Sequence, residues 1–563
     1  MDLSSTLRMG ATTPRTAGEQ IASSLADIGV RVAFGVISIH NMPILDAIAR
    51  QGRIRFVPAR GEAGAMNMAD AYARVSQTLG VVFTSTGTAA GNAAGSQIEA
   101  LTAGSPVLHI TSQVDRAFVD RDRAAIHDAP RQPDMLKAVS KAYFRIWEPE
   151  SAADILSAAA SAALNAPAGP VTLEIPVDVQ RLPVTGKRTA PVVAQALAPS
   201  PALLDQAVAL IARAKRPLLW LGGGARGASA AATELVERGF GAVTSTNGRA
   251  TVAEGHERSL GAFNMTPEAQ RIYANADLIV VVGSRLRGNE THNNDMPLPR
   301  PLVQIDADWT QAGRNYPADL FIASDARLAL EGLLTRLPAR LDTEEGFLRD
   351  ISAAREQAET NLRAALGPYQ ILADALRACV WKGRRPWVRD VTIANSTFGN
   401  RFVRIAAPNL GVHALGGGIG QGIAMGIGAA LVSGNPKAIV LLGDGGSQLM
   451  IGELATAVEA RAPAVFLLMN DRGYGVIRNI QDAQYEGRRV YTDILTPDFG
   501  LICQAVGMAH ERLAELGEFA NVLERALARP EPCMIEIDMT AVGSFRESFA
   551  GPPAGAAGGR ARP

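Results

Sequence analysis

The stretch "LLGDGGSQLM" (Leu441–Met450) joins an apolar run to a Gly-Asp-Gly-Gly turn. A second apolar run, "AVFLLMN", ends at Asn470, and 24 residues separate Gly445 from Asn470. This spacing predicts two buried parallel strands joined by one crossover helix. Ligands of open parallel sheets bind beyond the carboxyl ends of the strands. If the two strands are neighbours, Asp444 and Asn470 share that edge of the sheet.

The side chains at this edge have the chemistry of a metal and phosphate site. A carboxylate, an amide oxygen and a nearby backbone carbonyl form a hard oxygen site that suits Mg²⁺, which keeps water and binds ligand phosphates. Gly445 and Gly446 leave backbone N–H groups free at the start of a helix, which favours a diphosphate. An Asp-Gly pair alone often only turns the chain. The spaced Asn470 favours a ligand site over a simple turn.

The alternation of strand and helix patterns recurs along the whole chain in three blocks. It predicts an α/β protein with three doubly wound parallel-sheet domains. We expect these domains at residues 13–182, 200–337 and 368–541. Residues 542–563 form a tail rich in Gly, Ala and Pro that cannot build a core.

Composition excludes several classes of partner. The 563 residues carry 55 Lys and Arg against 55 Asp and Glu, so no basic excess attracts nucleic acid or an anionic membrane. The first twenty residues lack the apolar core of a signal peptide. The uncharged run at 415–434 has eight glycines, which predicts a buried helix rather than a membrane span. We therefore expect a cytoplasmic protein with reduced thiols at its three cysteines, Cys379, Cys503 and Cys533.

The GDG turn followed by Asn resembles the diphosphate-binding signature of thiamine diphosphate enzymes. The resemblance covers nearly the whole chain and is closest to the acetolactate synthase, 2-oxo acid decarboxylase and benzaldehyde lyase branch. It implies a pyrimidine-binding domain, a middle domain and a diphosphate-binding domain, in that order. It also implies thiamine diphosphate and Mg²⁺ as cofactors, with Asp444, Asn470 and the carbonyl of Arg472 as metal ligands.

A second match is the stretch "PARGEAGAMNMADAYAR", residues 58–74, which is similar to the family's segment around its indispensable glutamate. Glu62 falls at that position. The resemblance assigns its carboxyl to a hydrogen bond with the aminopyrimidine that promotes loss of the thiazolium C2 proton, while the cofactor serves as the electron sink. Taken alone, Glu62 would be an ordinary acidic residue in the first turn of a helix.

Two glycine-containing segments extend the resemblance. "GGGIGQGIAMGIGA", residues 416–429, resembles the family's glycine-rich segment, with Ile419 as an apolar wedge under the cofactor and the Gly417 carbonyl accepting from its 4′-amino group. "FTSTGTAAGN", residues 83–92, matches T-S-G-P-G-x-x-N in part, with Thr88 in place of proline. The cofactor contacts implied by the resemblance are Gly417, Ile419, Gly445, Gly446, Asn92, Asn395 and Tyr474.

The substrate side of the site is expected in the first domain. In "FGVISIHNMP", His40 falls at the variable position that faces the substrate, where histidine can relay protons near neutral pH. In "AAIHDAPRQPDM", His127 aligns with a position often held by an active-site glutamine, and Gln113 and Gln132 are nearby. The expected catalytic residues are therefore Glu62, His40, His127 and Gln132.

Three positions depart from the family pattern. Gly61 replaces the family's histidine before the glutamate. The chain has "GSRLRGNET" where acetolactate synthases carry R-F-D-D-R for FAD, which makes FAD doubtful. Ile480 stands where acetolactate synthases have a specificity-determining tryptophan, so the acceptor pocket differs.

The leading hypothesis is an acetolactate synthase-like carboligase that decarboxylates a 2-oxo acid such as pyruvate and transfers the acyl unit to an aldehyde or ketone. The alternatives are simple 2-oxo acid decarboxylation and benzaldehyde lyase-like chemistry, which His40 favours. A homodimer or homotetramer with sites between subunits is implied, and the tail is a candidate lid.

Two more distant readings are a catalytically silent regulatory homologue and a dehydrogenase. A silent homologue is expected to have lost Glu62, Asp444 or Asn470, and all three are present. The dehydrogenase reading rests on the G-x-G-x-x-G at residues 222–227. It also needs an acidic residue at the end of the next strand, and "GAVTSTNGR" ends without one.

Overall fold

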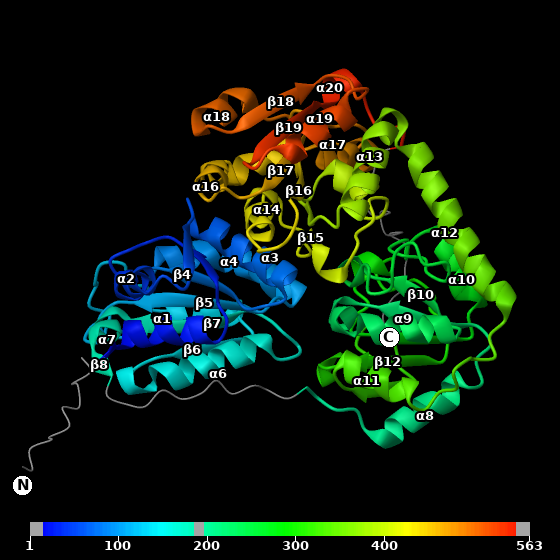
Figure 1. The fold of residues 1–563 in the computed structure, drawn as a ribbon, viewed down its shortest axis with the longest axis horizontal. Coiled ribbons are helices and arrows are strands. Elements are labelled where there is room, and N and C mark those ends of the chain that lie inside the picture. The colour runs from blue at the N-terminus through cyan, green and yellow to red at the C-terminus, as the bar shows by residue number, and fades with distance from the viewer. Residues whose placement is uncertain (1–14, 185–195, 548–563) are drawn as a thin grey trace, which may run out of the picture.

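The computed structural model describes residues 15–184 and 196–547. Within these ranges, three parallel sheets are each covered by helices on both faces, which confirms the predicted α/β class with three doubly wound domains (Figure 1). The proposed domain limits remain predictions. Residues 13–14 and most of the proposed lid, 548–563, lie outside the described part of the chain.

The first sheet has the strand order β3-β2-β4-β5-β7-β6. Its strands are β2 (Val32–Gly35), β3 (Arg55–Pro58), β4 (Gly80–Thr84), β5 (Val107–Gln113), β6 (Ala142–Arg145) and β7 (Val171–Pro176). The helices of this part are α1 (Ala17–Asp27), α2 (Met42–Gln51), α3 (Glu62–Ser76), α4 (Thr88–Ala103), α5 (Gln132–Ala138), α6 (Ala152–Leu164) and α7 (Val177–Arg181). A short antiparallel pair, β1 (Arg15–Thr16) and β8 (Pro183–Val184), joins its two ends.

The middle sheet has the order β10-β9-β11-β12-β13. Its strands are β9 (Pro217–Leu221), β10 (Gly241–Thr244), β11 (Leu278–Val282), β12 (Leu302–Asp306) and β13 (Leu320–Ala323). Its helices are α8 (Pro201–Ile211), α9 (Ser229–Arg238), α10 (Pro267–Asn275) and α11 (Ala326–Leu334), and the long α12 (Glu345–Ala365) leads to the third domain along the outside of the molecule (Figure 1).

The third sheet, β15-β14-β16-β17-β19-β18, repeats the strand order of the first. Its strands are β14 (Trp387–Arg389), β15 (Gly411–His413), β16 (Ala438–Gly443), β17 (Ala464–Asn470), β18 (Ala509–Leu513) and β19 (Cys533–Asp538). Its helices are α13 (Gln370–Lys382), α14 (Gly422–Ala430), α15 (Asp444–Ser447), α16 (Glu453–Glu459), α17 (Gly475–Gln484), α18 (Phe499–Val506), α19 (Phe519–Ala528) and α20 (Met539–Val542). The order reverses between β14 and β16, and this reversal is where open sheets bind ligands.

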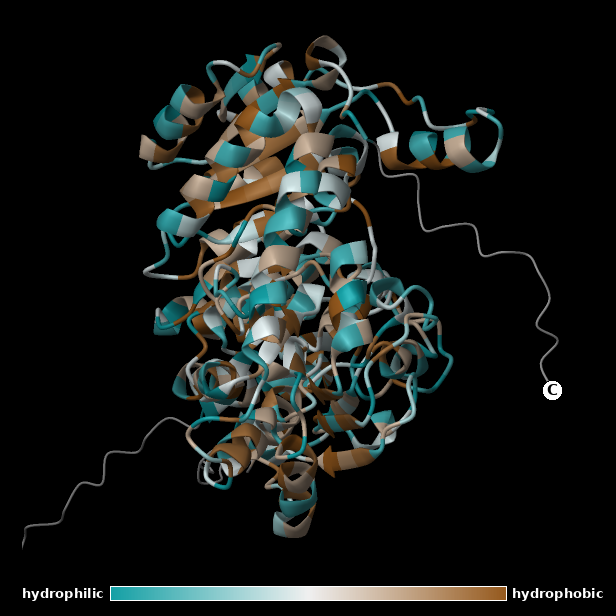
Figure 2. Cartoon of the chain, turned by 90° about the vertical axis from the view of Figure 1, so that its right-hand side faces the viewer, coloured by the Kyte–Doolittle hydropathy of each residue, from teal (hydrophilic) through white to brown (hydrophobic). Residues whose placement is uncertain are grey.

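The buried strands and the buried helix α14 were predicted from their apolar residues. All seven residues of β17 are buried, as expected for a parallel strand covered on both faces. In Figure 2 the strands of the third sheet are brown, and the helices around them have teal outer faces. The glycine-rich run becomes a turn followed by the buried helix α14, as predicted. No helix of the described residues is long and apolar enough to cross a membrane.

One element differs from its prediction. The single crossover helix expected between β16 and β17 is divided into α15, a 3₁₀ turn at Gln448–Met450, and α16. Helical structure begins at Asp444 itself, directly after the strand. The division places Glu453 at the start of its own short helix, facing the first domain.

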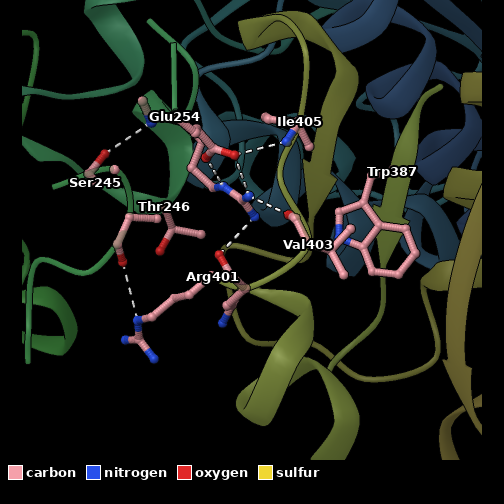
Figure 3. Close-up of polar contacts among 12 residues, drawn as sticks. Ser245, Thr246, Glu254, Trp387, Arg401, Val403 and Ile405 are labelled. Atoms are coloured by element: carbon pink, nitrogen blue, oxygen red, sulfur yellow. Dashed lines mark hydrogen bonds and ion pairs between the residues drawn. The ribbon is translucent and has the colours of Figure 1, made fainter. Parts of the chain in front are cut away.

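A buried ion pair joins the middle and third domains (Figure 3). Arg249 donates from Nε to Glu254 at 2.6 Å and from Nη2 to the Val403 carbonyl at 2.6 Å. Glu254 in turn accepts from the backbone N–H of Ile405 at 2.8 Å. A buried pair whose remaining polar groups are satisfied in this way fixes the two domains in one orientation.

Candidate active site

The carboxyl ends of β16 and β17 are adjacent, as predicted. The two strands pair in parallel with Gly443 opposite Met469. Asp444 and Asn470 are the next residue on each strand, so they lie beside each other at the carboxyl edge of the sheet. Both side chains are buried; Asp444 is 0 % exposed. The sheet therefore brings the two predicted metal ligands together at its carboxyl edge.

Asp444 closes the turn that follows β17. Its Oδ1 accepts from the N–H of Asp471 at 3.2 Å, and its Oδ2 accepts from the N–H of Gly473 at 2.8 Å and the hydroxyl of Thr496 at 3.1 Å. Arg472 between them has φ +58°, a left-handed conformation that turns the chain sharply. Three donors thus reach the carboxylate, and the side chain of Asp471 contacts it as well.

Asn470 is oriented from behind by a carboxylate. Its Nδ2 donates to Glu536 Oε1 at 2.7 Å, and Glu536 Oε2 pairs with His510 at 2.8 Å. The amide oxygen accepts only the N–H of Arg472, at 3.2 Å, and keeps one free acceptor position. Two protein oxygens with free lone pairs suit a cation that takes its other ligands from water and phosphate.

The loop after β16 packs too closely against its neighbours to accept a side chain at Gly445. A Cβ on Gly445 would lie 2.7 Å from the Gly473 carbonyl and 2.8 Å from the ring of Tyr474. Asn395 Oδ1 and Ser447 Oγ are buried without a protein partner. Backbone N–H groups at the start of α15, together with polar atoms that have no partner among the described residues, fit a bound diphosphate.

Asp471 reports the electrostatics of this edge. Burial, followed by the negative charge of Asp444, raises the pKa of its carboxyl to about 7, while Arg478 opposes the shift. A buried carboxylate, Asp444, in contact with the half-buried Asp471 favours a nearby cation.

Asp390, which follows β14 at the reversal of strand order, is a site residue that sequence reasoning missed. Its carboxylate accepts the N–H groups of Gly420 and Gly422, each at 3.1 Å, and so fixes the turn that carries Ile419. Burial raises the pKa of Asp390 to about 6 against these hydrogen bonds. The sequence pattern could have identified it, since Asp390 follows "WVR" as Asp444 follows "AIVLLG".

The two predicted cofactor contacts on the glycine-rich turn are also described. Ile419 is 40 % exposed, and Gly417 has φ +81°.

Glu62 is the first residue of α3 and is half-buried. Asn92 on α4 donates from Nδ2 to Glu62 Oε2 at 3.1 Å. The two strand-end loops of the first sheet thus bring together the glutamate and the asparagine that the sequence motifs singled out.

Comparison with known proteins places these features in one family. The chain matches the models of the thiamine pyrophosphate enzyme N-terminal TPP-binding domain at residues 15–135, the central domain at 204–333 and the C-terminal TPP-binding domain at 393–537. The chain belongs to the thiamine pyrophosphate enzyme family. Thiamine diphosphate is therefore the cofactor of this fold.

Curated relatives place the chain in the decarboxylase and acetolactate synthase branch. It is 30 % identical, over 93 % of this chain and 94 % of the relative, to a probable 2-ketoarginine decarboxylase of Pseudomonas aeruginosa. It is 27 % identical to the acetolactate synthase isozyme 3 large subunit of Escherichia coli, over 93 % of this chain and 95 % of that one. The acetolactate synthase large subunit of Lactococcus lactis is also 27 % identical, with 93 % and 92 % covered.

The two histidines predicted for the substrate side of this thiamine pyrophosphate enzyme lie together. Their rings meet edge to face with centroids 5.3 Å apart. His40 is buried and its Nδ1 lies 3.3 Å from Ser85 Oγ; burial, and then His127, lower the pKa of its imidazole. His127 is exposed and has φ +65°.

Gln132 is held inside the first domain by hydrogen bonds at both ends of its amide. Its Oε1 accepts from the Gly87 N–H at 2.7 Å and the Thr86 hydroxyl at 3.0 Å. Its Nε2 donates to the Ser112 carbonyl at 3.2 Å and to Glu174 at 2.7 Å. These hydrogen bonds hold the Gly87 turn, and the catalytic contact of Gln132 remains a prediction.

A cavity of about 450 Å³ lies between the first and middle domains of this family member. Its lining includes the G-x-G-x-x-G loop after β9 and Asp306 at the end of β12. The sequence pattern considered an acid at the end of β10, whereas Asp306, at the end of β12, is one of the acids that line the same cavity as the glycine loop. Burial raises the pKa of the Asp306 carboxyl. The family assignment nonetheless sets the dehydrogenase reading aside.

Proposed function

We propose that this thiamine diphosphate enzyme uses Mg²⁺, decarboxylates a 2-oxo acid such as pyruvate, and transfers the acyl unit to a carbonyl acceptor. The observation that carries the proposal is the adjacent placement of Asp444 and Asn470, whose carboxylate and amide oxygens lie at the carboxyl edge of the sheet. Together with the Arg472 carbonyl, these oxygens would hold Mg²⁺.

The diphosphate end of the cofactor would be held by backbone and small polar groups. The N–H groups of Gly445 and Gly446 at the start of α15 favour negative charge. Asn395, Tyr474 and the metal complete this set.

The aminopyrimidine and thiazolium end of the cofactor would contact Glu62, the Gly417 carbonyl and Ile419. Thiamine diphosphate, when bound, supplies the carbanion-stabilising thiazolium that decarboxylation and carbon–carbon bond formation require. Glu62 would hold the proton at N1′ of the aminopyrimidine, and Asn92 would keep its carboxyl oriented through Oε2. Gly417 would accept from the 4′-amino group, and Ile419 would support the cofactor from below.

His40 would move protons to and from the substrate. Burial lowers the pKa of its imidazole, so the ring is neutral at pH 7 and able to accept a proton. His127 lies at ring-contact distance and would share this task from the solvent side. This pair also keeps benzaldehyde lyase-like chemistry open.

Simple decarboxylation of a basic 2-oxo acid is a second candidate. It is favoured by the relative at 30 % identity that is named a probable 2-ketoarginine decarboxylase. Ile480, where acetolactate synthases carry tryptophan, also points to a different acceptor pocket. We include 2-ketoarginine among the donors to be tested for this reason.

The proposal includes a cytoplasmic homodimer or homotetramer with active sites between subunits. Large apolar side chains are exposed on the loops and helical turns that follow strands in both cofactor-binding domains, and exposed apolar surface of this kind marks sites of association. In the first domain these are Ile37, Ile39 and Ile126, and in the third they are Ile419, Leu449 and Ile477.

Two substitutions test the assignments separately. Glu62→Gln should retain Mg²⁺-dependent cofactor binding and lose about 10²-fold or more in the exchange rate of the cofactor C2 proton. Asp444→Ala should lose Mg²⁺-dependent binding, measured by calorimetry with and without the metal. Asp482→Ala, which removes an exposed carboxylate paired with Arg489, is the control. Unchanged exchange or unchanged affinity would remove the respective residue from its role.

A further inference from the structure

Glu453 of the third domain binds the backbone just before Glu62. Its Oε1 accepts the N–H groups of Arg60 and Gly61, each at 3.1 Å, and its Oε2 lies 3.2 Å from the Arg60 nitrogen. Thr456 donates to Oε2 at 2.6 Å. The carboxylate is 3 % exposed. It therefore caps the start of α3 from another domain, at the residues that set where Glu62 emerges.

Glu99 of the first domain makes the reciprocal contact. Its Oε1 accepts the N–H of Leu415 at 2.7 Å, and its Oε2 accepts the N–H of Gly416 at 2.6 Å. Arg74 neutralises this carboxylate at 2.9 Å and donates to the His413 carbonyl at 2.7 Å. Glu99 thus holds the backbone directly before Gly417.

Small residues make room for both carboxylates. A Cβ on Gly64 would lie 2.2 Å from Glu453 Oε1, and a Cβ on Gly416 would lie 2.7 Å from Glu99 Oε2. Between the two contacts, α3 and α14 approach so closely that a Cβ on Gly428 would lie 2.1 Å from the Met68 carbonyl. Glycine at these positions lets each carboxylate reach the main chain of the other domain.

We propose that Glu453 is a positioning residue for Glu62, and that Glu99 plays the same part for the Gly417 turn. Each domain thereby fixes the cofactor segment of the other through backbone N–H groups. The inference rests on the proposed roles of Glu62 and Gly417. Neither carboxylate needs to touch cofactor or substrate.

Acceptor geometry, rather than charge or proton transfer, is the feature that matters. A glutamine at 453 keeps one oxygen that can accept both N–H groups, and its NH₂ can donate to Thr456. Alanine removes every contact. A residue that relayed protons would be damaged equally by both substitutions, so the pair of variants separates the two roles.

The test uses the holoenzyme reconstituted with thiamine diphosphate and Mg²⁺. For Glu453→Ala we expect C2 proton exchange to fall by about tenfold or more, because a small displacement of a catalytic group is costly. The dissociation constant of the cofactor should change by less than about threefold, since the diphosphate end is held elsewhere. Glu453→Gln should keep most of the wild-type exchange rate.

Glu459→Ala is the matched control. Glu459 is on the same helix and pairs with the exposed side chain of Arg60, so its loss should leave exchange unchanged. If Glu453→Ala gives no folded protein, Gly64→Ala keeps the glutamate but displaces its carboxylate, and the same loss of exchange is expected.

The outcomes are separable from those of the proposed function. Wild-type exchange in Glu453→Ala or Gly64→Ala, with Glu62→Gln inactive in exchange, would overturn the positioning role alone. If the C2 exchange rate falls as much in Glu453→Gln as in Glu453→Ala, the positioning role is also overturned, and proton transfer by Glu453 is favoured instead. Wild-type exchange in Glu62→Gln would remove the proposed role of Glu62, and the positioning role with it.

Discussion

Asp390 controls the glycine-rich turn through two backbone hydrogen bonds. Asp390→Ala should free the N–H groups of Gly420 and Gly422 and loosen the segment that carries Ile419. We expect the free energy of unfolding to fall by about 1–3 kcal/mol, the cost of leaving buried donors unpaired, and cofactor affinity to fall with it. Denaturant titration and calorimetry check this, with the exposed Asp374→Ala as control. Equal cofactor affinity in Asp390→Ala and Asp374→Ala would contradict the role of Asp390 in holding this turn.

His109 predicts a pH dependence of stability. It is buried between Gln97, at 2.7 Å, and Thr84, at 2.8 Å, and burial lowers its pKa from 6.5 to about 3. Between these values the unfolded chain binds the extra proton, so the free energy of unfolding decreases as the pH falls from about 6.5 toward 3. His109→Gln should make this decrease shallower by up to about 1.4 kcal/mol per pH unit.

Urea unfolding at pH 7, 6 and 5 measures that slope. His256→Gln is the control, since His256 pairs with an exposed glutamate at the surface. Identical slopes for wild type and His109→Gln would show that His109 does not carry the effect.

At this scale the sequence revealed the residues that belong to compact motifs. Asp444, Asn470 and Glu62 stand in short patterns whose chemistry is readable, and the fold brings Asp444 and Asn470 together. Glu453 and Glu99 were not found, because they act on backbone N–H groups hundreds of residues away in the chain. The hydrogen bond from the Gln132 amide to the buried Glu174 could not be predicted either, because Glu174 lies 42 residues away in the chain.

Among the helices, the pair α3 and α14 depends on a close approach that only glycine allows. Gly428→Ala would place a Cβ 2.1 Å from the Met68 carbonyl and should destabilise the protein by about 1–3 kcal/mol through overpacking. Gly95→Ala, in the exposed interior of α4, meets nothing within 4 Å and should stabilise by about 0.5–1 kcal/mol. Thermal unfolding of the two variants checks the opposite signs, and a stable Gly428→Ala protein would contradict the packing argument.

The buried strands could be predicted because their apolar runs are continuous. The strands absent from the prediction are short or lie at sheet edges: β1, β6, β8, β14, β15 and β18. Edge strands are partly exposed and lack a clear pattern, and β14 has three residues. The division of the crossover helix could not be predicted, because the apolar periodicity continues across the 3₁₀ turn.

For the whole molecule, sites between subunits predict complementation. Glu62→Gln and Asp444→Ala chains should each be inactive alone. Mixed under conditions that exchange subunits, half of the dimers become hybrids, and each hybrid regains one site with both residues intact. We expect about a quarter of the wild-type activity in the mixture. Sites within one chain would give none, because every chain would lack one of the two residues.

The central claim is that this chain decarboxylates a 2-oxo acid with thiamine diphosphate and Mg²⁺. The most direct measurement is an NMR assay of products from pyruvate, with and without an aldehyde, alongside benzoin, 2-ketoarginine and other large 2-oxo acids. We expect loss of the donor carboxyl as CO₂ and an acetolactate or acyloin product. Release of an aldehyde alone would indicate the decarboxylase alternative. A holoenzyme with cofactor bound that consumes no 2-oxo acid would contradict the proposed decarboxylation.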